Sequence, residues 1–515
     1  MLSRTYSAAL QSIHARPVAV EVNCVPGSYF HLVGLPDTAI KESQDRVATA
    51  LMNSGYKYPM KHIIINLSPA DVRKEGSAYD LPIAVAMLAA DEQIVVPDLD
   101  QYMMVGELML DGSLRPIKGA LPIAIEAKSR GYKALILPID NADEAAVVEG
   151  LVVYGAGKLV EVIELLEGRS VLSPTEVSLS ELFARSQERI LFDFSEVKGQ
   201  EAVKRALEVA AAGGHNMLMI GAPGSGKSMM AKRLPGILPP FTMGEALETT
   251  KIYSVAGKLS RELTLMTTRP FRAPHHSISP VALVGGGSNP QPGEISLAHN
   301  GVLFLDELPE FSRNVLEVMR QPLEDRTVTV ARARFSVDYP ASFMLIAAMN
   351  PCPCGYYNHP TRSCECSPQQ VQRYLGKVSG PLLDRVDLQV EISPVPFEHL
   401  SDTQPAEPSS AIRARVMQAR AIQNRRFEAS PEVHCNAQMT PQMMQLYARP
   451  DEAGLQRLKV AMERLSLSAR AYDRILKVAR TIADLEGAEQ INQMHIAEAI
   501  SYRSLDRNNW GERRL

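Results

Sequence analysis

Residues 217–228 read Met-Leu-Met-Ile-Gly-Ala-Pro-Gly-Ser-Gly-Lys-Ser, an apolar run that leads directly into the pattern G-x-x-x-x-G-K-S. Glycines at these positions allow a tight turn whose backbone N–H groups point at phosphate oxygens. A lysine at 227 reaches the outer phosphates, and a serine at 228 can be a ligand of magnesium. The stretch predicts a strand, a phosphate-binding loop and a helix. The expected nucleotide-binding residues are Gly221, Ala222, Pro223, Gly224, Ser225, Gly226, Lys227 and Ser228.

A second stretch decides whether the bound nucleotide is hydrolysed. Residues 301–308 read Gly-Val-Leu-Phe-Leu-Asp-Glu-Leu, typical of a buried parallel strand that ends in two carboxylates. Asp306 would help Ser228 to hold magnesium, and Glu307 would activate the attacking water as general base. The alternative is a solvated turn with two acids. Together with the phosphate-binding loop, the pair predicts an ATPase that uses ATP and Mg²⁺.

Length, charge and cysteine content restrict the remaining possibilities. A chain of 515 residues is too long for one core, so we expect two to four domains. The net charge of -4 means that any contact with nucleic acid must come from a local basic surface. No run of eighteen apolar residues and no signal-peptide core is present, so we expect a cytoplasmic protein without a membrane partner. Six cysteines in so long a chain are not a disulfide framework.

Residues 1–170 are expected to form a mixed α/β domain. The expected strands span 18–23, 63–67, 103–110, 135–138 and 151–154. The expected helices span 81–90, 120–130, 143–149 and 158–166. Asp111-Gly112 between two extended runs predicts a tight hairpin.

The segments 74–80 and 105–117 of this domain resemble the proteolytic domain of Lon proteases, an S5 domain 2-like fold. That family uses a serine–lysine pair, and the two positions fall here on Ala78 and Leu121. Neither side chain can act as nucleophile or base, so the resemblance implies the protease fold without protease activity. The alternative is a shifted pair formed by Ser77 and Lys118.

After a linker at 171–195, residues 196–395 resemble the core of an AAA+ ATPase. Residues 192–200 are similar to its entrance, where Val197 and Gly199 would flank the adenine. The segments 269–277 and 284–288 resemble insertions of the magnesium-chelatase and MCM helicase branch. Its paired His275 and His276 are adjacent and should point apart, so we interpret them as polar residues that face the nucleotide or a central pore. Metal binding is the alternative.

Residues 325–337 alternate β-branched and polar side chains, which predicts a hairpin. Strand periodicity would put Arg332 and Arg334 on one face, where they can grip a phosphate backbone. This makes them the expected DNA-binding residues. The alternative is an exposed edge strand whose charges resist aggregation.

Another buried strand, 343–348, precedes Asn350, and the AAA+ resemblance makes Asn350 the sensor of the γ-phosphate or the attacking water. Two C-x-C pairs follow at once. They are Cys352, Cys354, Cys364 and Cys366. Four thiols at this spacing fit a tetrahedral, structural Zn²⁺ site, with simple turn cysteines as the alternative.

The chain from 379 onward contains the remaining AAA+ elements. Residues 379–388 resemble the arginine-finger motif, which would place Arg385 against the γ-phosphate held by a neighbouring subunit. A linker at 396–410 leads to a helical lid at 411–515, where Arg470 is the expected γ-phosphate contact and Arg474 the reserve. The arginine-rich helix at 411–428 indicates either a contact with nucleic acid or a solvated face.

The order of these parts resembles the YifB/ComM family of competence-associated, magnesium-chelatase-like ATPases. The resemblance implies a ring, a hexamer, that moves along single-stranded and branched DNA. It implies branch migration during the recombination of incoming DNA in natural transformation. Two alternatives remain: a chaperone-like protein remodeller related to the magnesium-chelatase ATPase subunit, and ATP-dependent proteolysis through Ser77 and Lys118.

Overall fold

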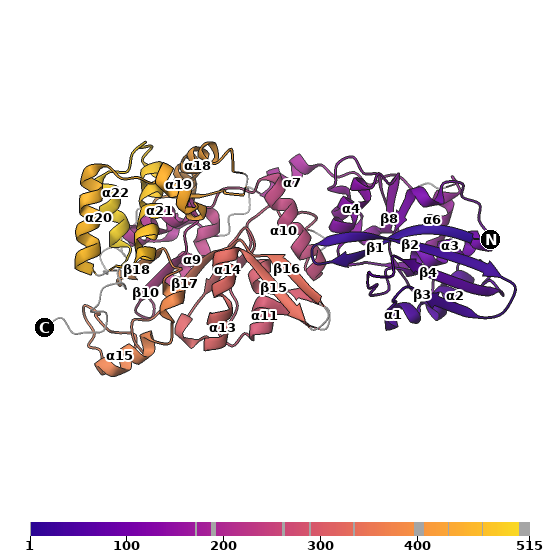
Figure 1. Ribbon diagram of the computed structural model, residues 1–515, viewed down its shortest axis with the longest axis horizontal. Coiled ribbons are helices and arrows are strands. Elements are labelled where there is room, and N and C mark those ends of the chain that lie inside the picture. Colours follow the sequence, from indigo (N-terminus) through magenta and orange to yellow (C-terminus); the bar gives the residue numbers. More distant parts are fainter. Residues whose placement is uncertain are drawn as a thin grey trace. The chain divides into compact units, whose positions relative to one another are not determined.

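A computed structural model describes residues 2–169, 172–186, 192–259, 263–287, 290–332, 335–395, 406–430, 432–465 and 467–503 (Figure 1). The chain divides into two compact units. The first is formed by Met1–Ser186 together with Met243–Thr267, and the second by Gln187–Thr242 together with Thr268–Leu515. Both contain helices and strands, and the second ends in a helical region. The expected α/β fold with a helical C-terminal region is confirmed.

Within the described residues, the first unit contains a seven-stranded mixed sheet. Its strands lie in the order β3 (Phe30–Val33), β4 (His62–Ser68), β2 (His14–Val25), β1 (Leu2–Gln11), β5 (Tyr102–Met104), β8 (Ala134–Pro138) and β9 (Val153–Ala156). The long β1 and β2 pair in antiparallel register, whereas β5, β8 and β9 run parallel to one another. The apolar α3 (Asp80–Ala90) packs against β1 and β2. The strands predicted at 18–23 and 63–67 are confirmed, and they lie within the longer β2 and β4.

The helices of the first unit lie between and after these strands. They are α1 (Thr38–Lys41), α2 (Ser43–Asn53), α3, α4 (Ala120–Ser129), α5 (Ile139–Ala146), α6 (Leu159–Leu166) and α7 (Leu179–Ser186). The hairpin predicted at Asp111-Gly112 is confirmed: β6 (Glu107–Leu108) and β7 (Leu114–Arg115) pair in antiparallel register, and Gly112 has a φ of 80°. A φ of this sign favours glycine.

The helix α10 (Met243–Ala256) belongs to the first unit, although it follows the phosphate-binding loop in the sequence. It packs against α4, where Leu247 contacts the hydrophobic core. The N–H of Gly119 donates to the carbonyl of Ser254 at 3.2 Å, and the Ser254 hydroxyl donates to the Glu144 carboxylate. The segment 243–267, which the sequence places in the ATPase core, thus folds with the N-terminal residues.

The second unit contains a parallel sheet, five-stranded within the described residues. Its strands lie in the order β11 (Phe271–Arg272), β14 (Val302–Leu305), β17 (Met344–Met349), β10 (Met217–Gly221) and β18 (Leu388–Ile392). Every residue of β10, β14 and β17 is buried, as the continuous apolar runs predict. Because the strands are parallel, the loops that follow β10, β14 and β17 lie at the same edge of the sheet.

Shorter elements surround this sheet. They are α8 (Glu201–Gly213), α9 (Lys227–Arg233), α11 (Pro280–Val284), β12 (Gly285–Gly286), β13 (Gln291–Pro292), α12 (Glu294–Leu297), α13 (Arg313–Val318), α14 (Arg320–Asp325), α15 (Pro368–Leu375) and α16 (Gly380–Leu383). The predicted hairpin is formed by β15 (Thr327–Arg332) and β16 (Phe335–Pro340), which pair in antiparallel register.

The C-terminal helices of the second unit share one hydrophobic core with its sheet. They are α18 (Ser409–Arg426), α19 (Pro441–Tyr447), α20 (Glu452–Leu465), α21 (Ala469–Leu485) and α22 (Gln493–Ser501). Their closest link to the sheet is α8, against which α18 and α21 pack.

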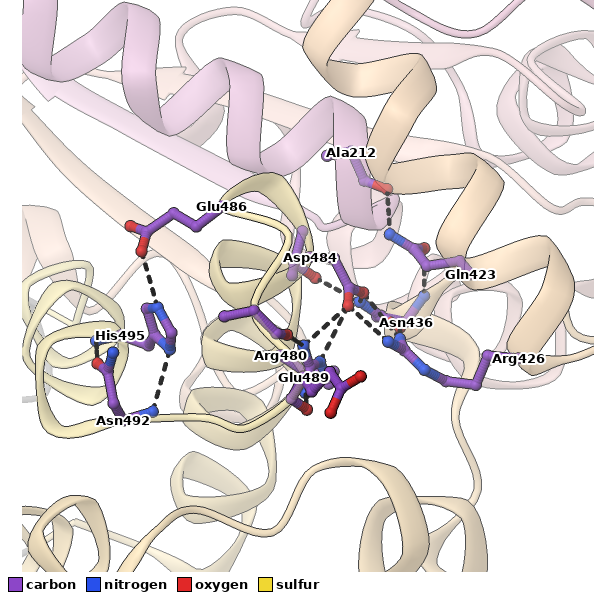
Figure 2. A network of polar contacts seen from close by, with 12 residues as sticks. Ala212, Gln423, Arg426, Asn436, Arg480, Asp484, Glu486, Glu489, Asn492 and His495 are labelled. Carbon is purple, nitrogen blue, oxygen red and sulfur yellow. Dashed lines mark hydrogen bonds and ion pairs between the residues drawn. The ribbon is translucent and has the colours of Figure 1, made fainter.

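A buried polar network adds to this packing (Figure 2). The Gln423 side chain donates to the carbonyl of Ala212 at the end of α8, at 3.1 Å. Arg426 and Arg480 both donate to the carboxylate of the buried Asp484, and Asn436 donates to it at 2.8 Å. The network fastens the helical region to the helix that leads into β10.

None of the helices in the described part of the chain has the length and apolar character that a membrane-spanning helix needs.

Candidate nucleotide-binding site

The phosphate-binding loop connects β10 to α9 and depends on its glycines. Gly224 and Gly226 have φ angles of 76° and 90°, and Gly226 is the residue before α9 begins. A Cβ on Gly221 would lie 2.6 Å from the carbonyl oxygen of Ile392 in β18, so a side chain would not fit. The loop is thus shaped so that its N–H groups and the start of α9 can face an anion.

Lys227 brings the loop together with the predicted sensor. Its Nζ donates to the carbonyls of Gly221 and Ala222 at 2.7 and 2.9 Å, and to Oδ1 of Asn350 at 3.2 Å. Burial lowers the pKa of Lys227, and the charges of Asp306 and Glu307 oppose this. The ammonium therefore lies between the phosphate-binding loop and the end of β17, where an outer phosphate would meet both groups.

The two predicted magnesium ligands are in direct contact. The hydroxyl of Ser228 donates to Oδ2 of Asp306 at 2.5 Å. A hydroxyl and a carboxylate oxygen are hard ligands of the kind that Mg²⁺ prefers, and Mg²⁺ in such sites is completed by water and substrate phosphates. The chemistry of this pair fits a magnesium ion bound together with ATP.

Glu307 directly follows Asp306 and is held in an uncommon backbone conformation. Its φ is 54°, which costs energy for a residue with a side chain. Its carboxylate is mostly exposed, and Oε2 lies 3.5 Å from Nδ1 of His276. Such strain is common where a side chain must be aimed at a reaction, so the geometry suits a general base.

His276 is the residue whose role the sequence left least defined. The expectation that His275 and His276 point apart was wrong, because their ring centroids lie 4.0 Å apart. Nδ1 of His275 pairs with the hydroxyl of Ser277 at 2.8 Å, whereas His276 faces Glu307. Among the described residues, neither histidine belongs to a group that could hold a metal.

A pocket of about 420 Å³ adjoins the predicted base and sensor. It is lined by Glu307, Glu310, Asn350, Pro353, Gln370, Arg373, Tyr374 and Lys377. Both acidic and basic side chains therefore surround the place where hydrolysis would occur.

The predicted arginine finger and the predicted lid arginine line a different pocket. Arg385 is buried, donates to the carbonyl of Pro381 at 2.6 Å and forms an ion pair with Glu324. Arg470 is exposed and donates to Asp384 at 3.2 Å. The complete lining is Glu324, Asp384, Arg385, Met439, Pro441, Met444, Arg470, Asp473, Arg474 and Lys477. The structure thus groups Arg470 with Arg385, in a pocket to which the phosphate-binding loop does not contribute.

Arg474 has a structural partner in this chain. It donates to the buried carboxylate of Asp387 at 2.9 Å, and His215 lies 3.6 Å from the same carboxylate. Burial alone would raise the pKa of Asp387, but Arg474, His215 and the N–H of Asn216 together lower it. The reserve candidate for the γ-phosphate therefore neutralises a buried acid.

The four cysteines of the two C-x-C pairs converge directly after Asn350. Their Sγ atoms all lie within 4.8 Å of one another, and all four thiols are free. Burial raises the pKa of the Cys354 thiol, but the N–H groups of Tyr356 and Glu365 outweigh this effect and lower the pKa to about 6. Burial raises the pKa of the other three thiols, so the observation that points to a metal site is the close approach of the four sulfur atoms.

The role of Arg332 and Arg334 in DNA binding stays a prediction. Arg332 is the last residue of β15 and pairs with Phe335 in the hairpin register. Arg334 and the side chain of Arg332 lie outside the described residues.

The arginine-rich helix α18 uses several of its arginines inside the unit. Arg426 contacts Asp484, and Arg415 forms ion pairs with Glu208 and Glu407. Arg420 donates to the carbonyls of Ala211 and His434. These side chains stabilise the unit, so the helix offers less free charge than the sequence suggests.

In the first unit, Ser77 and Lys118 do not form the serine–lysine pair that a shifted protease site would need. Ser77 donates to the Glu107 carboxylate at 2.5 Å, and Leu121 is buried in the core. The stem of Lys118 lies beside Gly257, where an added Cβ would be 2.7 Å from the lysine Cε. The hydroxyl of Ser77 thus pairs with a carboxylate and not with the amine of Lys118.

Comparison with known proteins identifies the family. Three family models match: "Magnesium chelatase, subunit ChlI" over residues 193–400, "Subunit ChlI of Mg-chelatase" over 20–141, and "Magnesium chelatase, subunit ChlI C-terminal" over 406–503. The competence protein ComM of Haemophilus influenzae is 45% identical over 512 residues, which cover 98% of each chain. This chain belongs to the YifB/ComM family. The uncharacterized protein YifB of Escherichia coli is also 45% identical, over 515 residues and 98% of each chain.

More distant relatives of this YifB/ComM family member are subunits of magnesium chelatase. The magnesium-chelatase 38 kDa subunit of Rhodobacter capsulatus is 24% identical over 341 residues, which cover 61% of this chain and 88% of that subunit. The family models and these relatives indicate a magnesium-chelatase-like AAA+ ATPase.

Proposed function

We propose that this YifB/ComM family member is an ATP-driven motor that assembles into a hexameric ring on DNA in the cytoplasm. It promotes branch migration when incoming DNA recombines during natural transformation. In this proposal the ATPase core and the helical lid form the motor, and the Lon-like unit is not a protease.

The observation that carries the proposal is the hydrolytic site at one edge of the parallel sheet. Lys227 contacts Asn350, Ser228 contacts Asp306, and Glu307 follows Asp306 at the end of β14. In this proposal Lys227 and Ser228 bind the phosphates and Mg²⁺, and Glu307 activates the attacking water. The name of the ComM relative supports a role in competence.

The position of Arg385 supports the proposed ring. It lines a pocket apart from the phosphate-binding loop of its own chain, together with Arg470. We propose that both arginines reach the γ-phosphate of ATP bound by a neighbouring subunit, as an arginine finger supplied in trans does. Arg385 must then exchange Glu324 for the nucleotide when the ring assembles.

The proposed DNA contact is the β15–β16 hairpin, with Arg332 and Arg334. Six copies in a ring would multiply a weak interaction. Replacing both arginines by alanine is expected to weaken the binding of single-stranded and branched DNA and to reduce its dependence on salt. On single strands, the logarithmic slope should fall by about 0.7 for each phosphate that is no longer neutralised. ATP binding should stay unchanged.

The double variant Arg457→Ala/Lys459→Ala is the matched control, since both residues are exposed on α20. It removes the same charge and should bind DNA like the wild type. Unchanged DNA affinity in the hairpin variant would contradict the proposed DNA-binding role of Arg332 and Arg334.

A chaperone-like remodeller is the second candidate, favoured by the magnesium-chelatase family models over 193–400 and 406–503. Such a protein needs a protein partner, and not DNA, to stimulate ATP turnover. The two candidates therefore differ in what accelerates hydrolysis.

A further inference from the structure

The sulfur atoms of the four clustered cysteines lie close enough together to surround one metal ion. Sγ of Cys352 lies 3.3 Å from that of Cys354 and 3.7 Å from that of Cys364, and Cys354 and Cys364 lie 3.5 Å apart. Cys366 completes the group. Four sulfurs at about 2.3 Å from a central zinc ion lie about 3.8 Å from one another, close to the separations found here. The separations among Cys352, Cys354 and Cys364 are within about 0.5 Å of that value, and the sulfur of Cys366 lies within 4.8 Å of the other three.

The loop that carries the cysteines supports the same assignment. N–H groups of Gly355 and Tyr357 face the sulfur of Cys352, and those of Tyr356 and Glu365 face Cys354. Backbone donors of this kind orient sulfur ligands around a metal. Four thiolates leave no position for a water or a substrate, so the site is structural.

The cluster also contacts the nucleotide site. Gly355, in the turn after Cys354, packs against the phosphate-binding loop so closely that a Cβ would lie 2.5 Å from Cδ of Pro223. Its φ of 84° allows this approach. On the other side of the cluster, α15 begins with the cap Ser367 next to Cys366, and the hydroxyl of Tyr374 in that helix hydrogen-bonds to the backbone of Asn350.

We propose that Cys352, Cys354, Cys364 and Cys366 bind one structural zinc ion that holds the phosphate-binding loop and the sensor Asn350 in register. In this proposal the metal holds the cysteine loop in one conformation. The loop then places Gly355 against Pro223 in the phosphate-binding loop, and α15, which follows the loop, places Tyr374 beside Asn350. The inference concerns the ATP site alone and stands whether or not DNA is the partner of the motor.

The first test is the zinc content of the full-length protein, purified without chelator. We expect one zinc per chain by elemental analysis, with release of that zinc when a mercurial reagent titrates the thiols. The variant Cys352→Ser/Cys364→Ser should contain none. The matched control Cys24→Ser/Cys435→Ser changes the two cysteines outside the cluster and should keep one zinc. A wild-type chain that is free of zinc, whether its four thiols are reduced or paired as disulfides, overturns the proposal.

The second test separates the metal from its effect on the nucleotide. Gly355→Ala should keep one zinc per chain but bind a fluorescent ATP analogue about tenfold more weakly, because the new methyl group displaces Pro223. Gly487→Ala is the control, since Gly487 has a φ of 69° and open space around its Cβ position. It carries the same backbone strain without the clash, and should bind the analogue like the wild type. Wild-type affinity in a zinc-containing Gly355→Ala variant would contradict the proposed coupling.

Discussion

The hydroxyl of Ser228 donates a 2.5 Å hydrogen bond to Oδ2 of Asp306, although 78 positions separate the two residues. The hydrogen bond exists because β10 and β14 are parallel and both flank β17, so that the residues after them meet at one edge. A hydroxyl and a carboxylate at this distance are two oxygen ligands of the kind that Mg²⁺ prefers.

The first prediction concerns this pair. Asp306→Asn should reduce ATP turnover by at least about a hundredfold, because the amide removes the charge that holds magnesium beside the phosphates. Binding of nucleotide measured in the absence of magnesium should change little. Asp143→Asn, at an exposed position of α5 in the first unit, is the control and should hydrolyse ATP like the wild type. Full turnover in Asp306→Asn would exclude Asp306 as a magnesium ligand.

The second prediction concerns His276, which faces Oε2 of Glu307 at 3.5 Å. We expect His276→Ala to lower kcat about tenfold and to leave KM for ATP unchanged, because the imidazole orients the base without touching the nucleotide. The neighbouring His275→Ala is the control, since His275 pairs with Ser277. Equal effects of the two substitutions, or a change in KM alone, would contradict a positioning role.

The third prediction tests whether active sites are shared between subunits. Lys227→Ala and Arg385→Ala should each abolish turnover, because the first removes the lysine that holds the phosphates and the second removes the finger supplied to the neighbour. When the two variants are mixed and reassembled, some interfaces combine an intact loop with an intact finger, so part of the activity should return. A mixture as inactive as its components would show that Arg385 does not act across subunits.

The fourth prediction concerns stability. Asp484 is buried and receives hydrogen bonds from Arg426, Arg480 and Asn436 (Figure 2). Asp484→Asn leaves the buried Arg480 and the partly buried Arg426 without a counter-charge, and should lower the free energy of unfolding of the second unit by about 3 kcal/mol. Urea unfolding, monitored by circular dichroism, measures this change in the free energy of unfolding. Glu452→Gln at an exposed position of α20 should cost less than about 0.5 kcal/mol. An Asp484 variant as stable as this control would exclude the network as a source of stability.

The sequence is informative about the candidate nucleotide site because the chemistry of that site is local. Gly224 and Gly226 determine the shape of the loop, and an apolar run before Asp306 is enough to predict a buried strand. The rule that parallel strands end at one edge then brings Lys227, Asp306 and Asn350 together without any knowledge of loops. The cysteine cluster could be predicted for the same reason, since two C-x-C pairs stand close together in the chain.

Long-range packing could not be predicted in this way. Helix α10 buries Thr249, Thr250 and Ser254 together with its apolar residues, so its sequence shows no apolar stripe that would reveal which face is packed or against which unit. Strand β1 was missed because the fully buried Thr5 and Ser7 hide the alternation of apolar and polar residues. Likewise, nothing near Arg385 or Arg470 in the sequence shows that one pairs with Glu324 and the other lies beside it in the same pocket.

The most direct test of a DNA-driven motor is ATP hydrolysis by the purified full-length protein, with and without single-stranded and branched DNA, at two salt concentrations. We predict that DNA accelerates hydrolysis severalfold and that the acceleration falls as salt rises, because salt ions compete with the protein for the phosphates. Glu307→Gln should bind DNA but show no turnover under any condition. Turnover that stays the same with DNA, in a preparation that assembles and binds ATP, would contradict the DNA motor and favour a protein-remodelling function.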